Sequence, residues 1–492
     1  GGKIIFVEKF PEYIDAEIKQ NTTDAFEIVP DIEKAIDRIE PVTRRISITD
    51  NDGNEIKQIL YLLREDKDVY YLFLCNTSME WNKDVLGRHT LSRERNIEFN
   101  DVTISSVAME WKYPVFELDP ETGDVYPADT MKIENNYAIK TSFPPLKSHL
   151  YIIPKNNIAI QAQTKEKLQE IEKINLEKEM WDVQFSEKNA LVLDMPYFRI
   201  KNSQWQEKKE ILKLDREIRK QLRIPVRGGT MVQPWARRKE RRLNGTLVTL
   251  RYVFDVEDIP SSEILLAIEK PDLYRISING YSISSDMECG WWVDKSLRVL
   301  KFEPYILTRG QNEIILETIY NEDHPGLEII YLLGDFGVKI ANNQPKIIEK
   351  IEKLKIGDWT QQGLPFYSGN ITYLYEMQVE IKEKQKIFVR IPDYRGTAVR
   401  ILVNGKQAGI IAWKPNEVDI TDFIRSGNKC LLGIEILGHR RNSHGPLHFH
   451  QKWPIWTGPY SFVPEGEEFI EDYQIVPCGL MKTPEVIRYS VE

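Results

Sequence analysis

Four of the seven histidines lie in one short segment, residues 438–459, together with arginines, an asparagine and two tryptophans. His444 and His448 have the i, i+4 spacing that places two metal ligands on one face of a helix. Gly445 and Pro446 stand between them and disfavour that helix, so we predict no metal site. Arginine and tryptophan are enriched at protein interfaces. This favours a polar loop that docks on another domain or reaches into that domain's active site.

A second segment, residues 290–299, contains two adjacent tryptophans and a nearby carboxylate. Neighbouring side chains of a strand point to opposite faces, so one of Trp291 and Trp292 should enter the core while the other faces solvent or a groove. An exposed indole can stack on the apolar C–H face of a sugar, and Asp294 can accept hydrogen bonds from sugar hydroxyls. The alternative is that both indoles are packing residues, one of them at a domain interface.

A third segment, residues 357–373, combines aromatic residues with three glycines. Such a segment forms either a groove wall or a structural lid over the end of a sandwich. We expect any carbohydrate contact at the loop end of the last module, with matching candidates in the module before it. The candidate carbohydrate-binding residues are Trp291, Trp292, Asp294, Trp359, Tyr367, Trp413, His439, Arg440, Asn442 and His444. If the histidine-rich loop, residues 438–459, is instead an interface, its side chains should be buried and hydrogen-bonded within the protein.

The sequence lacks the catalytic motifs that can be recognised from spacing alone. There is no nucleophile elbow, no HExxH, no phosphate-binding loop and no dinucleotide fingerprint. Asp and Glu number 75, but glycosidase chemistry needs two of them to converge on one bond, which a sequence does not show. We therefore predict no catalytic residue, no metal and no cofactor in this chain.

Composition sets further limits on the class of protein. Apolar residues make up 41% and charged residues 29% of the 492 residues, a balance typical of globular domains. The net charge is -9 and basic residues are mixed with acidic ones, so we expect no nucleic-acid partner. No apolar run approaches the roughly 20 residues of a membrane span, so no membrane partner is expected. Four scattered cysteines are typical of a reducing compartment, which favours a cytoplasmic location.

The first 40 residues have a different pattern from the rest. Gly1 and Gly2 before the apolar run 4–7 indicate a helix C-cap followed by a buried strand. Pro30 and Asp31 then open a helical pattern. One strand and one helix do not close an α/β layer, so we expect residues 1–40 to be the end of an α/β domain that begins upstream.

Most of the remaining chain alternates apolar and polar residues. The runs 59–65, 69–76 and 114–127 predict strands of an antiparallel sandwich, and the third contains an Asp-Pro-Glu-Thr-Gly turn. The charged segment 163–180 has a helical pattern and is interpreted as a link between modules. We predict a mainly β fold of consecutive β-sandwich or jelly-roll modules with a short α/β remnant at the N-terminus.

An internal repeat is the clearest structural signal. The segments 250–257 and 264–284 match 373–380 and 387–409, and each half contains an Asn-Gly pair between alternating runs. Asn279-Gly280 and Asn404-Gly405 are therefore predicted to form equivalent two-residue hairpin turns. A period this long indicates two duplicated domains and not a solenoid.

The runs LPFYSGNITY, VRILVNGKQAG, AWKPNEVDIT and HRRNSHGP resemble the C-terminal galactose-binding-like jelly roll of large bacterial glycoside hydrolases. These enzymes are of the α-L-rhamnosidase type and share sandwich modules with the family 2 glycosidases. GWWVDKSLRV and YLLGDFGV resemble the preceding sugar-binding-type domain. YLFLCNTS and PVFELDPETGDVYP resemble the sandwich before that, and GGKIIFVEK the last strand of an α/β domain. Residues 82–104 depart from that sandwich pattern and are interpreted as an inserted loop.

The resemblance implies four parts. These are an α/β remnant at 1–40, an antiparallel sandwich at 41–160, a galactose-binding-like jelly roll with a linker and a helical insertion at 161–345, and a second one at 346–492. It implies a non-catalytic C-terminal region of a glycoside hydrolase, with the upstream catalytic domain and carbohydrate as partners, because the family's catalytic residues lie in a barrel upstream. The alternatives are a stand-alone carbohydrate-binding or adhesion protein and an intact hydrolase with an unrecognised site.

Overall fold

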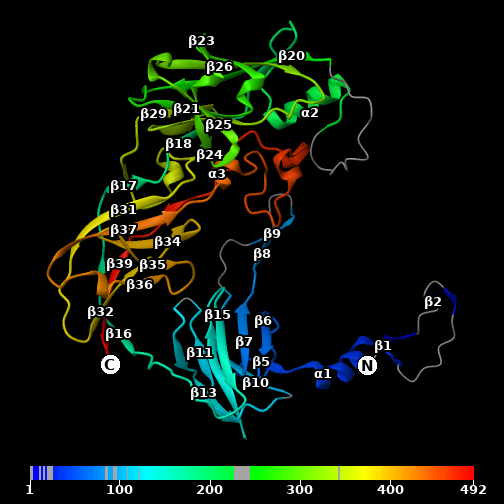
Figure 1. The fold of residues 1–492 in the computed structure, drawn as a ribbon, viewed down its shortest axis with the longest axis vertical. Helices are drawn as coiled ribbons and strands as arrows, with labels where there is room; N and C mark the ends of the chain where they lie inside the picture. The colour runs from blue at the N-terminus through cyan, green and yellow to red at the C-terminus, as the bar shows by residue number, and fades with distance from the viewer. Residues whose placement is uncertain are drawn as a thin grey trace. The chain divides into compact units, whose positions relative to one another are not determined.

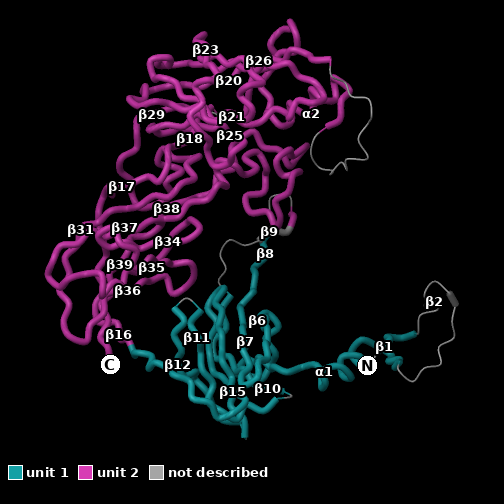
Figure 2. Tube along the Cα trace, viewed as in Figure 1, with its two compact units in different colours: residues 1–82, 92–167 teal, residues 83–91, 168–492 magenta. Residues whose placement is uncertain are grey.

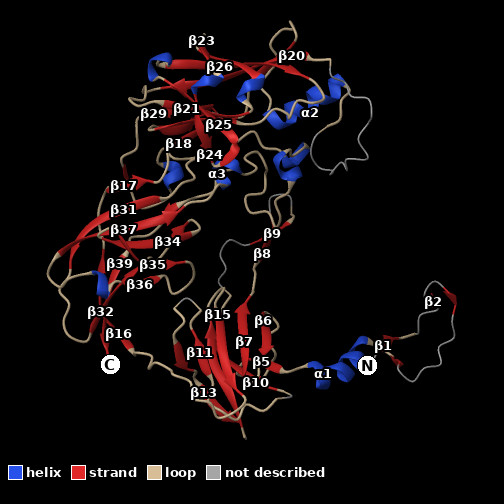
Figure 3. Cartoon of the chain, viewed as in Figure 1, coloured by secondary structure: helices blue, strands red, loops and turns tan. Residues whose placement is uncertain are grey.

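The computed structural model describes residues 4–9, 13–14, 17–18, 26–83, 87–91, 97–107, 109–120, 122–133, 135–226, 244–341 and 344–492. The chain forms two compact units, one of residues 1–82 and 92–167 and one of residues 83–91 and 168–492 (Figure 2). Strands dominate both units (Figure 3), which confirms the predicted mainly β fold. Among the described residues, no helix is long and apolar enough to cross a membrane.

The N-terminal residues form a small α/β element. β1 (Ile4–Val7) pairs in parallel with β4 (Phe26–Val29), and α1 (Ile32–Thr43) follows. β2 (Tyr13–Ile14) and β3 (Glu17–Ile18) form a separate two-stranded pair. The Asp31 carboxylate accepts the backbone N–H of Lys34 at 2.8 Å and caps α1, which confirms the predicted helix start. Gly1 and Gly2 lie outside the described residues.

The first unit also contains one sandwich, which we call the N-terminal sandwich (Figure 1). One sheet has the order β13-β14-β10-β5 and the other β12-β11-β15-β7-β6. The predicted runs 59–65 and 69–76 are strands β6 and β7, and 114–127 contains the hairpin β11-β12. Alternate side chains of both sheets meet in a core around Trp111 and Phe143. The strands are β5 (Ile46–Thr49), β6 (Ile59–Glu65), β7 (Val69–Asn76), β10 (Phe99–Ser106), β11 (Phe116–Leu118), β12 (Val125–Pro127), β13 (Thr130–Ile133), β14 (Asn136–Phe143) and β15 (Ser148–Pro154).

The second unit contains two sandwiches, one inserted into the other. The inserted sandwich has sheets β18-β27-β21-β25-β24 and β23-β22-β26-β20-β29-β28, with β19 also paired to β20. Helix α2 (Ile211–Leu222) contributes Ile211, Leu214 and Ile218 to its core. The strands are β18 (Asn189–Leu193), β19 (Tyr197–Ile200), β20 (Thr246–Val256), β21 (Ile264–Glu269), β22 (Tyr274–Ile278), β23 (Tyr281–Ile283), β24 (Glu288–Trp292), β25 (Asp294–Phe302), β26 (Gly310–Tyr320), β27 (Ile330–Gly334), β28 (Gly337–Ala341) and β29 (Gln344–Ile348).

The outer sandwich is built from chain on both sides of this insertion. Its sheets have the orders β16-β39-β32-β36 and β30-β17-β31-β37-β34-β35, and β33 pairs with β38. The inserted sandwich therefore lies, in sequence, between β17 and β30. The elements are β16 (Leu168–Asn175), β17 (Trp181–Phe185), β30 (Lys353–Leu354), β31 (Ile371–Gln378), β32 (Gln385–Arg390), β33 (Tyr394–Arg395), β34 (Ala398–Val403), β35 (Lys406–Ile411), β36 (Glu417–Asp419), β37 (Lys429–Leu437), α3 (Arg441–His444), β38 (Gly479–Leu480) and β39 (Glu485–Val491).

The two sandwiches share one strand order, which supports the predicted repeat. The order β23-β22-β26-β20 in one corresponds to β35-β34-β37-β31 in the other, and β25-β21-β27-β18 corresponds to β36-β32-β39-β16. Both Asn-Gly pairs are two-residue hairpin turns with positive φ at both residues, as a type I′ turn requires. Asn279 Oδ1 accepts the N–H of Glu313 at 3.0 Å, and Asn404 Oδ1 accepts the N–H of Leu431 at 2.9 Å. The predicted hairpins are confirmed and are tied to equivalent strands.

Three sequence-based interpretations need correction. The helical pattern predicted at 163–180 is wrong, because residues 168–175 form β16 and pair with β39, and β17 begins at Trp181. The inserted loop predicted at 82–104 ends earlier, because β10 already begins at Phe99. It contains the last two residues of β8 (Trp81–Lys83) and the whole of β9 (His89–Leu91). Basic residues are not mixed with acidic ones throughout, because five of residues 237–242 are Arg or Lys; this segment lies outside the described residues. The predicted domain boundaries stay predictions.

We expect Asn404→Ala to destabilise its hairpin by about 1–2 kcal/mol and Asn279→Ala to destabilise its own hairpin by more. Asn404 Oδ1 accepts one hydrogen bond, whereas Asn279 accepts one and its Nδ2 also donates to the Ile306 carbonyl and to Asn312 Oδ1. Alanine also tolerates the left-handed conformation less well than asparagine. Hydrogen exchange followed by mass spectrometry should show faster exchange in 274–283 for the first variant and in 398–411 for the second. Asn404→Asp is the matched control for Asn404→Ala, since it keeps the acceptor for the Leu431 N–H. A spread of either effect into the other hairpin would contradict independent, equivalent turns.

Candidate functional site

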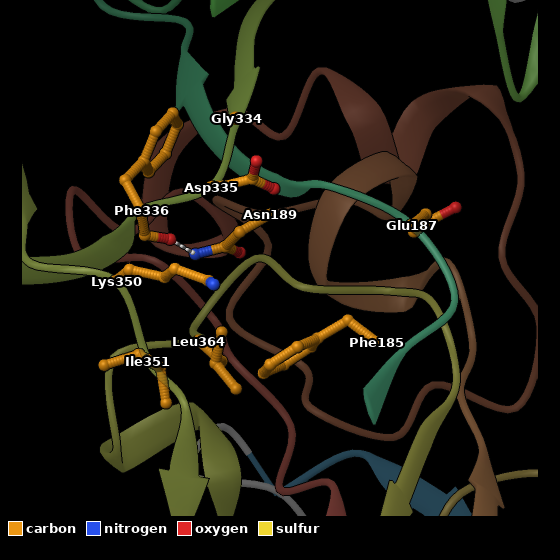
Figure 4. A pocket seen from close by; sticks show the side chains of 9 residues that line it. All are labelled: Phe185, Glu187, Asn189, Gly334, Asp335, Phe336, Lys350, Ile351 and Leu364. Carbon is orange, nitrogen blue, oxygen red and sulfur yellow. Dashed lines mark hydrogen bonds between the residues drawn. The ribbon is translucent and has the colours of Figure 1, made fainter. Parts of the chain in front are cut away.

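The candidate site lies where the inserted sandwich meets loops of the outer sandwich. Phe366 and Leu447, both in loops of the outer sandwich, belong to the hydrophobic core of the inserted sandwich. A small cavity of about 40 Å³ remains at this junction, and Asn189 Nδ2 donates to the Phe336 carbonyl at 2.8 Å beside it (Figure 4). That volume holds one or a few waters and is far below the roughly 300 Å³ of a ligand pocket. This cavity is therefore a packing feature and not a binding site.

A larger hollow of about 410 Å³ opens beside the edge strand β24. Side chains from β21, β25 and β27 form an apolar floor, and the two adjacent tryptophans form a wall. Trp291 is 55% exposed, while Trp292 is partly buried. The lining residues are Lys188, Leu265, Cys289, Gly290, Trp291, Trp292, Val299 and Leu333. The predicted division of roles between the two indoles is thus present, although both of them line the hollow.

The turn after the tryptophans is strained. Val293 has φ of 63°, a left-handed conformation that β-branched residues rarely adopt. Trp292 and Asp294 pair directly across this turn, which fixes the direction of the strand that presents both indoles. Asp294 Oδ1 accepts the N–H of Ser296 at 2.8 Å, and this backbone hydrogen bond lowers the pKa of the exposed carboxyl group. Asp294 is therefore an ionised acceptor at neutral pH.

Trp292 is held in place by the histidine-rich loop. Its ring centroid lies 5.0 Å from those of Tyr331 and His444, and the His444 ring stacks on Tyr331 at 5.2 Å. The Arg440 guanidinium carbon lies 6.0 Å from the Trp292 ring centroid. Arg440 forms a bidentate ion pair with Glu187, with an Nη2–Oε2 distance of 2.8 Å. These contacts fix one indole as a rigid wall and leave the other free at the surface.

Other residues of the same loop are buried within the junction. Asn442 is fully buried; its Nδ2 donates to the Val476 carbonyl at 2.8 Å and its Oδ1 accepts the Val476 N–H at 2.9 Å. Tyr331 donates its hydroxyl hydrogen bond to the Ser443 carbonyl at 3.1 Å. The Oγ atoms of Ser443 and Ser368 lie 2.6 Å apart. This part of the loop has the structural features predicted for an interface.

The structure therefore divides the candidate residues. It brings Trp292, Asp294, Arg440 and His444 together near the hollow, with Trp291 at its surface. Carbohydrate contact by Trp359 and Tyr367 is excluded by their position, because they are 0% and 2% exposed in the core of the outer sandwich. The same holds for Asn442, whose amide is already paired. His439 is partly buried, and Trp413, 47% exposed, follows β35 and does not line the hollow.

Sequence reasoning missed Lys188, Cys289, Glu187 and Tyr331. Lys188 and Glu187 lie in the short crossing from β17 to β18, and no sequence pattern predicts that this crossing lies beside β24. Tyr331 belongs to a continuously apolar run, 329–333, and such a run hides which side chain faces which layer. Cys289 is two residues before Trp291, so strand alternation places both on one face, and this signal was available.

A second cluster of polar residues is buried at the same junction. The Asp194 carboxylate lies 3.1 Å from His448 Nε2 and accepts the Tyr473 hydroxyl at 2.7 Å. His448 Nδ1 lies 3.0 Å from the Ile470 carbonyl. Burial alone would lower the pKa of His448, but the hydrogen bond and charge of Asp194 outweigh it and raise that pKa. Glu210 caps α2, and burial raises its pKa to about 7.

Comparisons with known proteins find solved structures of low similarity. No protein-family model matches the sequence, and no curated protein matches it. A solved rhamnosidase from Novosphingobium sp. PP1Y matches with 12% identity and a TM-score of 0.37, over 94% of this chain and 26% of that chain. The α-L-rhamnosidase of Streptomyces avermitilis, solved with L-rhamnose, matches with 11% identity and a TM-score of 0.22, over 91% and 39%. A β-D-mannosidase from Dictyoglomus thermophilum matches with 14% identity and a TM-score of 0.21, over 51% and 31%.

The chain thus spans about a quarter of the length of the Novosphingobium structure. Two of these matched structures are rhamnosidases, the type of enzyme named in the predicted resemblance.

We expect His444→Gln to reduce the acid sensitivity of the second unit. Burial, with help from Arg440, lowers the pKa of His444 to about 4, whereas an unfolded histidine titrates near ~6.5. Between these values the unfolded chain binds the proton and the folded chain does not. Stability is therefore lost as the pH falls from about 6.5 towards 4. Thermal unfolding of both proteins at several pH values tests this.

His448→Gln is the control, because the pKa of His448 is shifted in the opposite direction to that of His444. Its raised pKa contributes stability that is present below about 6.5 and is lost as the pH rises through the folded-state value. The glutamine at 448 should therefore leave the loss between pH 6.5 and 4 in place. Equal acid loss in the wild type and His444→Gln would contradict the assignment.

Proposed function

We propose that this chain is a non-catalytic C-terminal region of a multidomain glycoside hydrolase, and that the hollow beside β24 binds carbohydrate. The observation that carries the proposal is the pair of indoles on that hollow, one rigid and one exposed at 55%. Sugar recognition requires an aromatic plane, an apolar surface for C–H groups and fixed acceptors for hydroxyls. Trp291, the floor residues Leu265 and Val299, and the Asp294 carboxylate supply them.

The state of the carboxyl groups favours a non-catalytic role. A glycosidase needs one carboxyl group with a raised pKa that can reach the leaving oxygen. Burial raises the pKa of Glu210, but this residue is 5% exposed and its two oxygens accept the N–H groups of Leu212 and Lys213. Near the hollow, Glu187 and Glu288 are in ion pairs with Arg440 and Arg298.

An exposed apolar face on the N-terminal sandwich supports a role beside another domain. Leu62 on β6 and Phe73 on β7 are direct neighbours in the sheet and are 52% and 38% exposed. Leu60 and Tyr71, on the same face, are 57% and 37% exposed. The free face of an antiparallel sheet usually carries polar residues, and a contiguous apolar patch indicates a docking surface. We propose the catalytic domain of the same enzyme as its occupant.

We expect Trp291→Ala to weaken carbohydrate binding by at least about tenfold, since a factor of ten corresponds to ~1.4 kcal/mol and an aromatic contact contributes about that much. The loss should come without a change in thermal stability, because the side chain is largely exposed. Isothermal titration of the chain with a panel of mono- and oligosaccharides measures the effect.

Trp413→Ala is the matched control, because it removes an equally exposed indole from another part of the outer sandwich. It should leave binding unchanged. Loss of binding with Trp413→Ala and not with Trp291→Ala would move the site to the outer sandwich and contradict the proposal.

We also expect the chain alone to hydrolyse neither aryl rhamnosides nor aryl galactosides. The reason is that, within the part of the chain that the structure describes, the carboxyl group with a raised pKa is that of Glu210, which is buried and has no access to substrate. A chromogenic assay at high protein concentration measures turnover. Activity that a single Asp→Asn or Glu→Gln substitution in the chain abolishes would contradict the non-catalytic role.

A further inference from the structure

We infer that the hollow selects neutral saccharides over acidic ones such as uronates and sulfated sugars. The inference rests on the proposed carbohydrate-binding function and adds the chemical class of the ligand. Its basis is the distribution of charge around the two tryptophans, where Lys188, Arg298 and Arg440 each have a carboxylate partner.

The cation that lines the hollow is already neutralised. Among the described residues lining it, Lys188 is the charged one, and its Nζ lies 3.4 Å from Asp335 Oδ2. Asp335 is held in turn by the hydroxyl of Ser262, whose Oγ donates to Oδ2 at 2.9 Å. The other lining side chains are aliphatic or aromatic, or end in the thiol of Cys289. An acidic sugar would therefore have to compete with Asp335 for Lys188.

The neighbouring cations are paired in the same way. Arg298, which lies opposite Trp291 in the sheet, forms an ion pair with Glu288. Arg440, beside Trp292, forms a bidentate ion pair with Glu187. This pair already uses the guanidinium N–H groups that would otherwise bind the carboxylate of a ligand.

Charge pairing of this kind has opposite effects on the two classes of sugar. A neutral ring gains from stacking on Trp291 and from the apolar floor, and its hydroxyl groups can donate to Asp294. An anionic ring has to lose part of its hydration in a hollow whose charged lining residue, Lys188, is already paired with Asp335. The chain as a whole, at a net charge of -9, adds to this repulsion at low salt.

The test is isothermal titration of the whole chain with neutral oligosaccharides and with uronate and sulfated oligosaccharides of equal length. We expect neutral ligands to bind at least about tenfold more tightly, since the anions gain no compensating ion pair. Neutral affinity should change less than about twofold between ~20 mM and ~500 mM NaCl, because no charge pairing between ligand and protein is screened. Equal or tighter binding of the acidic ligands overturns the inference and leaves the proposed function standing. Binding of neither class overturns both.

Asp335→Asn provides a second arm. It frees Lys188 while keeping a side chain of the same shape. We expect it to strengthen uronate binding at low salt by at least about threefold and to leave neutral binding unchanged, as for an ion pair worth under about 1 kcal/mol. Circular dichroism and thermal unfolding verify the fold of the variant. Unchanged uronate binding by the folded variant would show that Lys188 does not face the ligand and would overturn the argument from its pairing.

Discussion

The packing of Trp292 against Tyr331 and His444 is the interaction on which the rest of the second unit depends. Only two short crossings of the chain connect the inserted sandwich to the outer one, and two crossings alone leave a hinge. The aromatic cluster joins an edge strand, an inner strand and the histidine-rich loop in one contact. It thereby fixes the loop on the inserted sandwich and, at the same time, the wall of the hollow. The structural and the functional role of Trp292 are therefore inseparable, whereas Trp291 is free for a ligand.

Buried charges give this junction its specificity. Asp194, Glu210 and His448 lie in a nearly dry environment, where an ion pair gains little net stability because desolvation offsets attraction. Their hydrogen bonds are directional, however, and a shifted loop would leave them unsatisfied at a cost of about 1–3 kcal/mol for each group. The cluster and the Asn442–Val476 contacts thus select one arrangement of residues 440–476 on the inserted sandwich. Because these contacts fix the position of the loop, the hollow beside β24 has a defined shape.

The local features of the fold were predictable, and the long-range ones were not. Strands β6 and β7, the cap at Asp31 and the hairpins at Asn279 and Asn404 depend on residues close in sequence, and each was predicted. The charged segment 168–175 was misinterpreted as helical because its alternation is masked by charged residues on both faces of an exposed strand. The insertion of one sandwich into the other depends on pairing between β16 and β39, more than 300 residues apart, which no local pattern reveals. The choice between a groove wall and a structural lid for Trp359 and Tyr367 could not be made from sequence, because a glycine-rich aromatic segment has the same pattern in both cases; the structure buries both residues.

The most direct test of the account is a crystal structure of the chain grown with a neutral oligosaccharide. The account predicts a sugar ring stacked on Trp291 in the hollow beside β24, with a hydroxyl group within hydrogen-bond distance of Asp294 and with Trp292 unmoved against Tyr331 and His444. A sugar bound elsewhere, for example against Trp413, with the hollow free of ligand, would contradict it.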